Sequence, residues 1–152
     1  MSRPSPEQLG PPHVRLGAFQ LWVHGWEFPN VRDKDDGNWL NVVAHCGGDG
    51  ASVWANGPIL DTVGLRRFRD QLKTLRQTLV GKAALFSQEL NIDVRVAAHL
   101  SAHPSGRLRV EADITPNPSV QSHRFEFDVD PGDLEETVAQ LESVLKAYPV
   151  ID

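Results

Sequence analysis

The sequence contains very little cysteine and no long hydrophobic run. Cys46 is the single cysteine among 152 residues, so no disulfide can form within the chain and a disulfide-stabilised secreted scaffold is excluded. No stretch approaches the roughly 18 consecutive apolar residues that a membrane-spanning helix needs. Residues 1–12 have no apolar segment of the kind found in secretion signals. We therefore expect a soluble protein of the reducing cytoplasm that does not bind membranes.

The motifs of common catalytic chemistry are also missing. The glycine-rich segment 47–50 has no P-loop lysine and does not open a helix. None of the six histidines belongs to an i, i+4 pair on a predicted helix, because His99 and His103 fall in a predicted strand and a turn. His45 and Cys46 are neighbours in a predicted strand, so their side chains point to opposite faces and cannot form a nucleophile–base pair. Cys46 is predicted to be a small buried hydrophobic residue. We expect a binding protein without metal or cofactor, not an enzyme.

The charged residues are unevenly distributed along a chain of net charge −5. Residues 61–82 contain six basic and two acidic side chains, whereas residues 126–152 contain eight acidic side chains and one lysine. An acidic surface attracts basic partners and speeds their encounter. The alternative is that both segments are the solvated faces of two helices. The negative net charge and the absence of a helix-turn-helix motif argue against nucleic-acid binding.

Order is expected to begin near Val14, after a disordered N-terminal tail over residues 1–13 that is rich in proline. Residues 14–152 are predicted to form one α+β domain. Three antiparallel strands come first, including a long first strand that ends before Pro29. Leucines at steps of three and four then predict a helix, which is capped by Asp61 or Thr62 and ended by Gly81. The three strands are predicted over 16–28, 39–46 and 51–56, and the helix over 65–79.

The second half repeats this scheme with four strands and a helix. Strict alternation of apolar and polar residues predicts a sheet with one buried face and one solvent-exposed face. Asp130 is predicted to cap the last helix, with Pro131 as its first residue. The strands are predicted over 83–86, 92–100, 108–114 and 125–129. The order β-β-β-α-β-β-β-β-α, with about seven strands, favours an α+β fold with antiparallel sheets. The two halves share their element order, but no residue-level repeat is apparent.

An acidic loop joins the first two predicted strands. Its spacing fails the EF-hand pattern, because Gly37 falls at position five and Ala44 at position twelve. Two tryptophans flank the loop, and they belong either to the core or to an exposed surface. If they are exposed, aromatic rings beside carboxylates form a protein-binding patch. The residues predicted for this patch are Trp26, Asp33, Asp35, Asp36 and Trp39.

Two segments around this loop resemble the signature of WapI-like immunity proteins. Residues 25–29, Gly-Trp-Glu-Phe-Pro, and residues 36–42, Asp-Gly-Asn-Trp-Leu-Asn-Val, match its elements "Y-E-F-P" and "D-x-N-W-L-x-V". The resemblance extends from Phe19 to Pro149 as an order of elements. Two departures occur: Trp26 stands where the family often has tyrosine, and residues 87–90, Ser-Gln-Glu-Leu, lack the usual "E-P-x-L".

The resemblance implies a small bacterial protein of the cytoplasm that neutralises the toxic domain of a cognate toxin by direct binding. It supplies no catalytic residue and no cofactor. Some such toxins are nucleases, and an acidic inhibitor that covers a basic active site would fit electrostatic steering.

Two alternatives to toxin binding remain open. The first is a small-molecule pocket between sheet and helices, where His24, His45 and His99 would converge. The second is a structural subunit or homo-oligomer that uses a sheet edge or the wet face of the second half. The sequence fixes neither the partner nor the oligomeric state.

Overall fold

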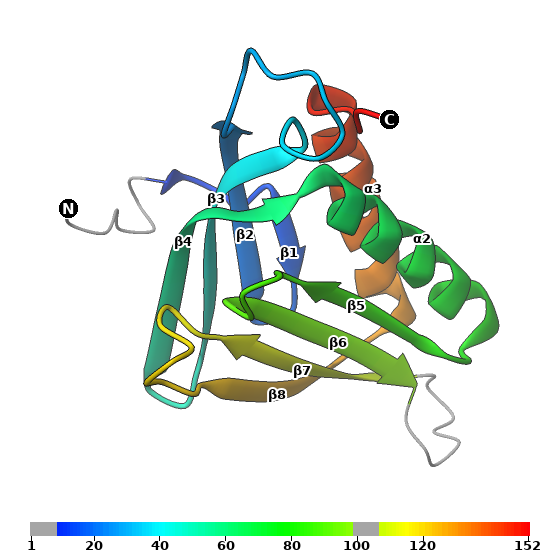
Figure 1. The fold of residues 1–152 in the computed structure, drawn as a ribbon. Helices are drawn as coiled ribbons and strands as arrows, with labels where there is room; N and C mark the ends of the chain where they lie inside the picture. Colours follow the sequence, from blue (N-terminus) through cyan, green and yellow to red (C-terminus); the bar gives the residue numbers. More distant parts are fainter. Residues whose placement is uncertain (1–8, 99–106) are drawn as a thin grey trace.

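The computed structural model describes residues 9–98 and 107–152. Two four-stranded antiparallel sheets are each followed by one helix, so the order β-β-β-β-α occurs twice (Figure 1). The first sheet and its helix are β1 (Val14–Leu16), β2 (Phe19–Trp26), β3 (Trp39–Gly48), β4 (Ala51–Asp61) and α2 (Thr62–Thr78). The second are β5 (Lys82–Phe86), β6 (Ile92–Ala98), β7 (Leu108–Ile114), β8 (Arg124–Val129) and α3 (Pro131–Ala147). The predicted α+β class with antiparallel sheets is confirmed.

The predicted long first strand is wrong, because the chain reverses at Gly17. The hairpin pairs Leu16 with Phe19, and Gly17 has a φ of 55°. A Cβ at Gly17 would lie 2.6 Å from the ring of Phe127, so glycine meets both a steric and a conformational need. Even-numbered residues face the core before the reversal, and odd-numbered residues face it afterwards. The segment predicted as one strand therefore has apolar residues at both even and odd positions. The described residues therefore form eight strands instead of about seven.

The strand β4 is longer than the predicted segment 51–56, since it continues to Asp61. Its register with β3 shifts between Leu40 and Val42, where Pro58 and Ile59 lie between the paired residues Gly57 and Leu60. Proline is tolerated there because β4 is an edge strand with an irregular register at this point. The continuation carries the chain directly into α2.

The helix ends follow the predicted caps in part. Asp61 Oδ1 accepts the N–H of Gly64 at 2.7 Å, which makes Asp61 the N-cap of α2. The predicted closure at Gly81 is wrong, because Leu79 ends the helix in a left-handed conformation and donates its N–H to Leu75 O. At α3, Asp130 is the N-cap as predicted, and its N–H donates to Asp133 Oδ2 at 2.8 Å.

The two helices carry a residue-level repeat that the sequence analysis did not find. Gln71 and Gln140 are each the tenth residue of a 17-residue helix. Gln71 Oε1 accepts the N–H of Ala84 in β5 at 2.9 Å, and Gln140 Oε1 accepts the N–H of Arg15 in β1 at 2.8 Å. Each helix therefore covers the first strand of the other sheet and blocks an edge that would otherwise be open to pairing.

One hydrophobic core joins the inner faces of both sheets to the helices. Cys46 is fully buried in it, as predicted. A smaller aromatic cluster lies on the outer face of the first sheet, where Trp22 stacks on Trp54 with ring centroids 5.8 Å apart. Trp22 Nε1 donates to Gly10 O at 3.1 Å, so residues just before β1 contact this face. The predicted disordered tail falls mainly on residues 1–8, which lie outside the described residues.

The opposite charges of the two helices meet within the molecule. Arg76 and Glu135 lie 2.9 Å apart, and Lys73 and Glu142 lie 3.8 Å apart. All four side chains are largely exposed, where an ion pair contributes about 0–1 kcal/mol. The uneven charge distribution along the sequence is thus partly used in packing α2 against α3.

Candidate functional site

Asn38 anchors the loop between β2 and β3, which lies at one end of the molecule near the C-terminus (Figure 1). This side chain is only 2% exposed. Its Nδ2 donates to Lys34 O at 3.0 Å and to Ile151 O at 2.9 Å. Its Oδ1 accepts the hydroxyl of Thr62 at 2.6 Å and the N–H of Ile151 at 2.8 Å. The sequence analysis missed this role, because the partners are distant in sequence.

The acids of the predicted patch have different environments. Asp33 Oδ1 accepts the N–H groups of Asp35 and Asp36 at 3.0 and 2.8 Å, so it shapes the turn. Gly37 completes that turn by donating its N–H to Asp33 O at 2.8 Å. Asp35 and Asp36 are exposed and form no ion pair with another described residue. Two of the three predicted acids therefore present free carboxylates.

The two tryptophans of the predicted patch point to opposite faces of the sheet. Trp26 pairs with Leu40 in the register and packs edge-on against Tyr148, with ring centroids 5.4 Å apart. Trp39 precedes Leu40, so its side chain lies on the other face. Both are partly buried, which is intermediate between the core and the exposed alternatives. The five predicted residues thus lie around the loop but do not share one face.

The indole of Trp39 forms one wall of a cleft, which we call the Trp39 cleft. Its volume is about 290 Å³, and its lining residues are Trp39, Pro58, Ile59, Ser87, Gln88, Glu89 and Asn91. Glu89 supplies the charge of this lining, and it forms no ion pair within residues 9–98 and 107–152. The cleft therefore combines an aromatic wall with an unpaired carboxylate.

The turn between β5 and β6 supplies the other wall of the Trp39 cleft and contains a strained leucine. Leu90 has a φ of 62°, a conformation that costs a residue other than glycine about 1–2 kcal/mol. Its side chain is 58% exposed. The turn is held by the N–H of Leu90 donating to Ser87 O at 3.1 Å, and by the N–H of Ile92 donating to Ser87 Oγ at 3.1 Å. A strained, exposed leucine thus lies beside the cleft.

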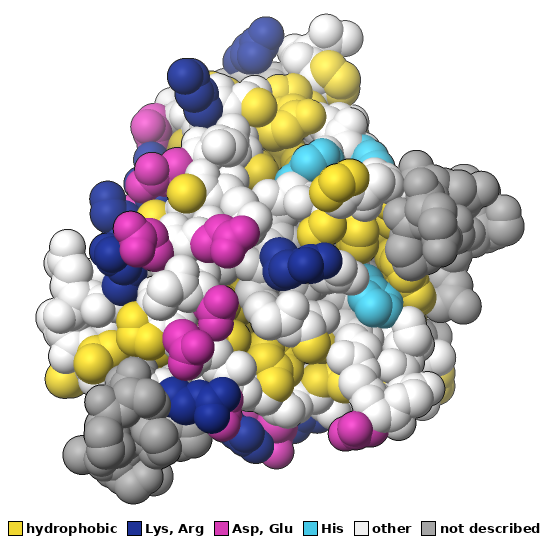
Figure 2. Space-filling model, turned by 180° about the vertical axis from the view of Figure 1, so that it is seen from behind, with side chains coloured by type: hydrophobic (Ala, Val, Ile, Leu, Met, Phe, Trp, Pro, Cys, Tyr) yellow, Lys and Arg dark blue, Asp and Glu magenta, His cyan; other side chains and the backbone are white. Residues whose placement is uncertain are grey.

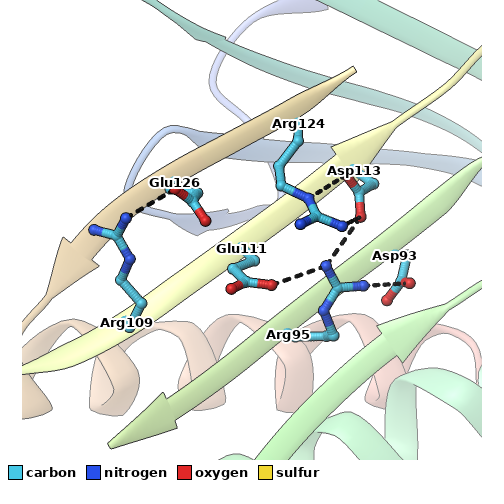
Figure 3. Close-up of polar contacts among 7 residues, drawn as sticks. All are labelled: Asp93, Arg95, Arg109, Glu111, Asp113, Arg124 and Glu126. Carbon is cyan, nitrogen blue, oxygen red and sulfur yellow. Dashed lines mark hydrogen bonds and ion pairs between the residues drawn. The ribbon is translucent and has the colours of Figure 1, made fainter. Parts of the chain in front are cut away.

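The outer face of the second sheet is covered by paired charges (Figure 3). Arg95 bridges Asp93, Glu111 and Asp113, and Arg124 also pairs with Asp113. Burial by itself would lower the pKa of Arg95, but hydrogen bonds to Asp113 and Glu111 outweigh it and raise that pKa. The arginines of this network remain charged, and they already have partners within the chain.

The histidines proposed to converge are not brought into one pocket by the described residues. His45 contacts Gln20 Oε1 at 2.9 Å and Ser52 Oγ at 2.7 Å, and burial lowers its pKa. A second pocket of about 280 Å³ is lined by His13 and Tyr148, among others, but contains neither His24 nor His45. His99 lies outside the described residues. Figure 2 shows histidines among hydrophobic side chains on the face that it displays.

Burial raises the pKa of the Cys46 thiol to about 11, so this thiol is neutral at physiological pH. Within the described part of the chain, no group of three or more potential metal ligands occurs. No helix found there has the length and apolar character to cross a membrane.

Several solved structures resemble the chain at low sequence identity. The CdiA-CT/CdiI toxin and immunity complex from Enterobacter cloacae, at 11% identity and a TM-score of 0.43, covers 82% of this chain and 99% of its own. Structures of Trypanosoma bruciei MRP1/MRP2, at 16% identity and a TM-score of 0.46, cover 97% and 96%. A guide-RNA-binding protein complex bound to a guide RNA, at 16% identity and a TM-score of 0.43, covers 86% and 90%.

The search of curated proteins finds no match. The sequence profile of the immunity protein WapI-like family matches residues 15–149. This match confirms the resemblance that the segments 25–29 and 36–42 indicated. Because it spans most of the sequence, the chain belongs to the immunity protein WapI-like family.

Proposed function

We propose that this protein neutralises the toxic domain of a cognate bacterial toxin by binding to it directly. The observation that carries the proposal is the family match over residues 15–149. Inhibition arises from occlusion of the toxin surface and involves no chemical step, so one molecule inhibits one toxin domain. The protein acts in the bacterial cytoplasm, where the toxic domain would otherwise damage its target.

The contact surface that we propose is the end of the molecule formed by the loop between β2 and β3. Asp35 and Asp36 offer free carboxylates there, and the Phe28 side chain is 43% exposed. Trp39 presents part of its ring in the adjacent cleft. Aromatic rings are typical of the residues that dominate binding energy in protein interfaces. Asp33 and Trp26 support this surface from within, through the turn and through Tyr148.

An acidic protein of this kind is suited to a basic partner. Its net charge of −5 favours encounter with a positively charged toxin domain. Rim carboxylates such as Asp35 chiefly raise the association rate, and this contribution falls as ionic strength rises. A basic active-site surface, as in a nuclease, has the charge that this protein would cover.

Co-expression with the toxin domain encoded beside this protein's gene tests the proposal. We expect growth to be rescued, and we expect a purified toxin domain to lose activity at one equivalent of this protein. Substoichiometric amounts should leave the remaining toxin fully active, since an inhibitor that acts by occlusion does not turn over. Continued killing would contradict toxin neutralisation, and complete inactivation by a small fraction of an equivalent would contradict the non-enzymatic mechanism.

A further inference from the structure

We propose that the Trp39 cleft is the recognition pocket for the toxin domain and receives one cationic side chain, arginine or lysine, from its surface. This inference rests on the proposed function, since it names the chemistry of the partner group that the same end of the molecule binds. The cleft lies between the end of β4, at Pro58 and Ile59, and the turn between β5 and β6. Its floor and walls are therefore provided by both sheets.

The chemistry of the walls favours a cation. The face of a tryptophan ring attracts a guanidinium or ammonium group placed within about 6 Å of its centroid. Glu89 adds a carboxylate that can form a charge-assisted hydrogen bond with the same group. Neither lysine nor arginine lines the cleft among the described residues. Trp39 and Glu89 therefore both attract a cation, and no lysine or arginine of the lining repels it.

The cleft is large enough to admit one long side chain. Its volume of about 290 Å³ lies just below the roughly 300–1,000 Å³ that is typical of small-molecule sites. Arginine is enriched in protein interfaces, and interface residues that dominate affinity tend to pair with one another across the contact. A single long cationic side chain that anchors a larger interface is thus the occupant that this geometry supports.

Leu90 lies between the lining residues Glu89 and Asn91 but does not itself line the cleft. Its left-handed φ of 62° and its 58% exposed side chain both destabilise the protein when no partner is bound. No described residue packs around this side chain sufficiently to bury it. Leu79 also has a positive φ, but it ends α2, where such a conformation is common. Strained residues of this kind are concentrated where proteins bind their partners. Burial against the toxin domain would compensate for the exposure of Leu90.

Carboxylates that are already paired within the molecule are less available to a basic partner. The carboxylates of Glu135 and Glu142 are paired with α2, and Asp113 is held by two arginines in Figure 3. A partner cation that approaches these groups must compete with a cation already in place. Glu89 has no such competitor among the described residues, so the incoming side chain forms a new ion pair.

Calorimetry with the full-length protein and the toxin domain encoded beside its gene tests the pocket. We expect Glu89→Gln to weaken Kd by about 10-fold, and Trp39→Ala by about 10-fold or more. Glu89→Lys should weaken it by about 100-fold, because it places like charges together. Glu136 is an exposed glutamate of α3 without an ion pair among the described residues, and Glu136→Lys should leave Kd within about threefold.

Leu90→Asn separates recognition from folding. Asparagine tolerates a left-handed conformation, so the melting temperature should stay unchanged or rise while Kd weakens by about 10-fold. A purely structural role would instead lower the melting temperature and leave Kd unchanged. Val120, which is 76% exposed in another turn, provides the matched control Val120→Asn, and this variant should retain wild-type binding.

Different results would contradict the pocket proposal and the proposed function. If the wild type binds and neutralises the toxin domain but Glu89→Lys and Leu90→Asn bind equally well, the pocket proposal is wrong and the proposed function stands. If the wild type neither binds nor protects against that toxin domain, both are wrong. Glu89 lies on the surface, so its variants should fold even if Trp39→Ala does not.

Discussion

Replacement of Asn38 by alanine should destabilise the protein far more than a loop substitution normally does. The change removes four side-chain hydrogen bonds, which join the loop at Lys34, the start of α2 at Thr62, and Ile151 near the C-terminus. Each bond contributes about 0.5–1.5 kcal/mol. The C-terminal partner can move into water once released, so we expect a loss of about 2–4 kcal/mol in the free energy of unfolding.

Urea denaturation followed by tryptophan fluorescence measures this loss. For a protein of this size, 1 kcal/mol corresponds to a shift of about 2–4 °C in melting temperature, so Asn38→Ala should melt about 4–16 °C lower. Asn41 is the matched control, because it lies three residues further along the chain in β3, is partly exposed, and has no side-chain hydrogen bond among the described residues. Asn41→Ala should change the free energy of unfolding by about 0.5 kcal/mol or less.

A variant that lacks residues 151–152 measures how much of the destabilisation by Asn38→Ala comes from the bonds to Ile151. Two of the four bonds end on Ile151, so Asn38→Ala should cost roughly half as much in the shortened protein. If Asn38→Ala and Asn41→Ala destabilise the full-length protein equally, the assignment of Asn38 as the anchor of the loop is refuted.

Three further substitutions test other parts of the fold. Gly17→Ala should cost at least about 1–2 kcal/mol in the free energy of unfolding, measured in urea, because of its positive φ and the nearby Phe127 ring. Gln71→Ala and Gln140→Ala should each cost about 1 kcal/mol in the same assay, and clearly unequal losses would contradict their equivalence. Because burial lowers the pKa of His45 below its usual 6.5, the unfolded chain binds this proton first as pH falls. Stability should therefore decline from about pH 6.5 downward, and His45→Gln should reduce that decline in unfolding measurements between pH 7.5 and 5.

Local patterns in the sequence were sufficient for most elements of the fold. The leucine spacing of α2, the Asp130–Pro131 start of α3 and the clean alternation in β6 and β7 all correspond to the structure. These patterns depend on residues close in sequence, where periodicity and capping act directly. The errors occurred at Gly17 and Leu79, where a reversal or a cap depends on one residue adopting a positive φ.

The binding surface stays a prediction. The sequence indicated the loop between β2 and β3, and it treated Trp26 and Trp39 as one patch. Strand pairing places them on opposite faces of the first sheet, and the carboxylate of one predicted acid, Asp33, accepts backbone hydrogen bonds within the turn. The sequence assigned no binding role to Glu89 and Leu90, because nothing local distinguishes them from residues of an ordinary turn.

The sequence by itself determined the α+β class, the buried state of Cys46 and, through the segments 25–29 and 36–42, the family. Each of these depends on composition, periodicity or a contiguous motif, and such signals are carried by neighbouring residues. Only the tertiary structure decided that each helix covers the other half's sheet, that Asn38 binds Ile151, and that Trp39 and Glu89 share a cleft. These are contacts between residues far apart in the chain, and their partners are selected by how the two sheets and helices pack together.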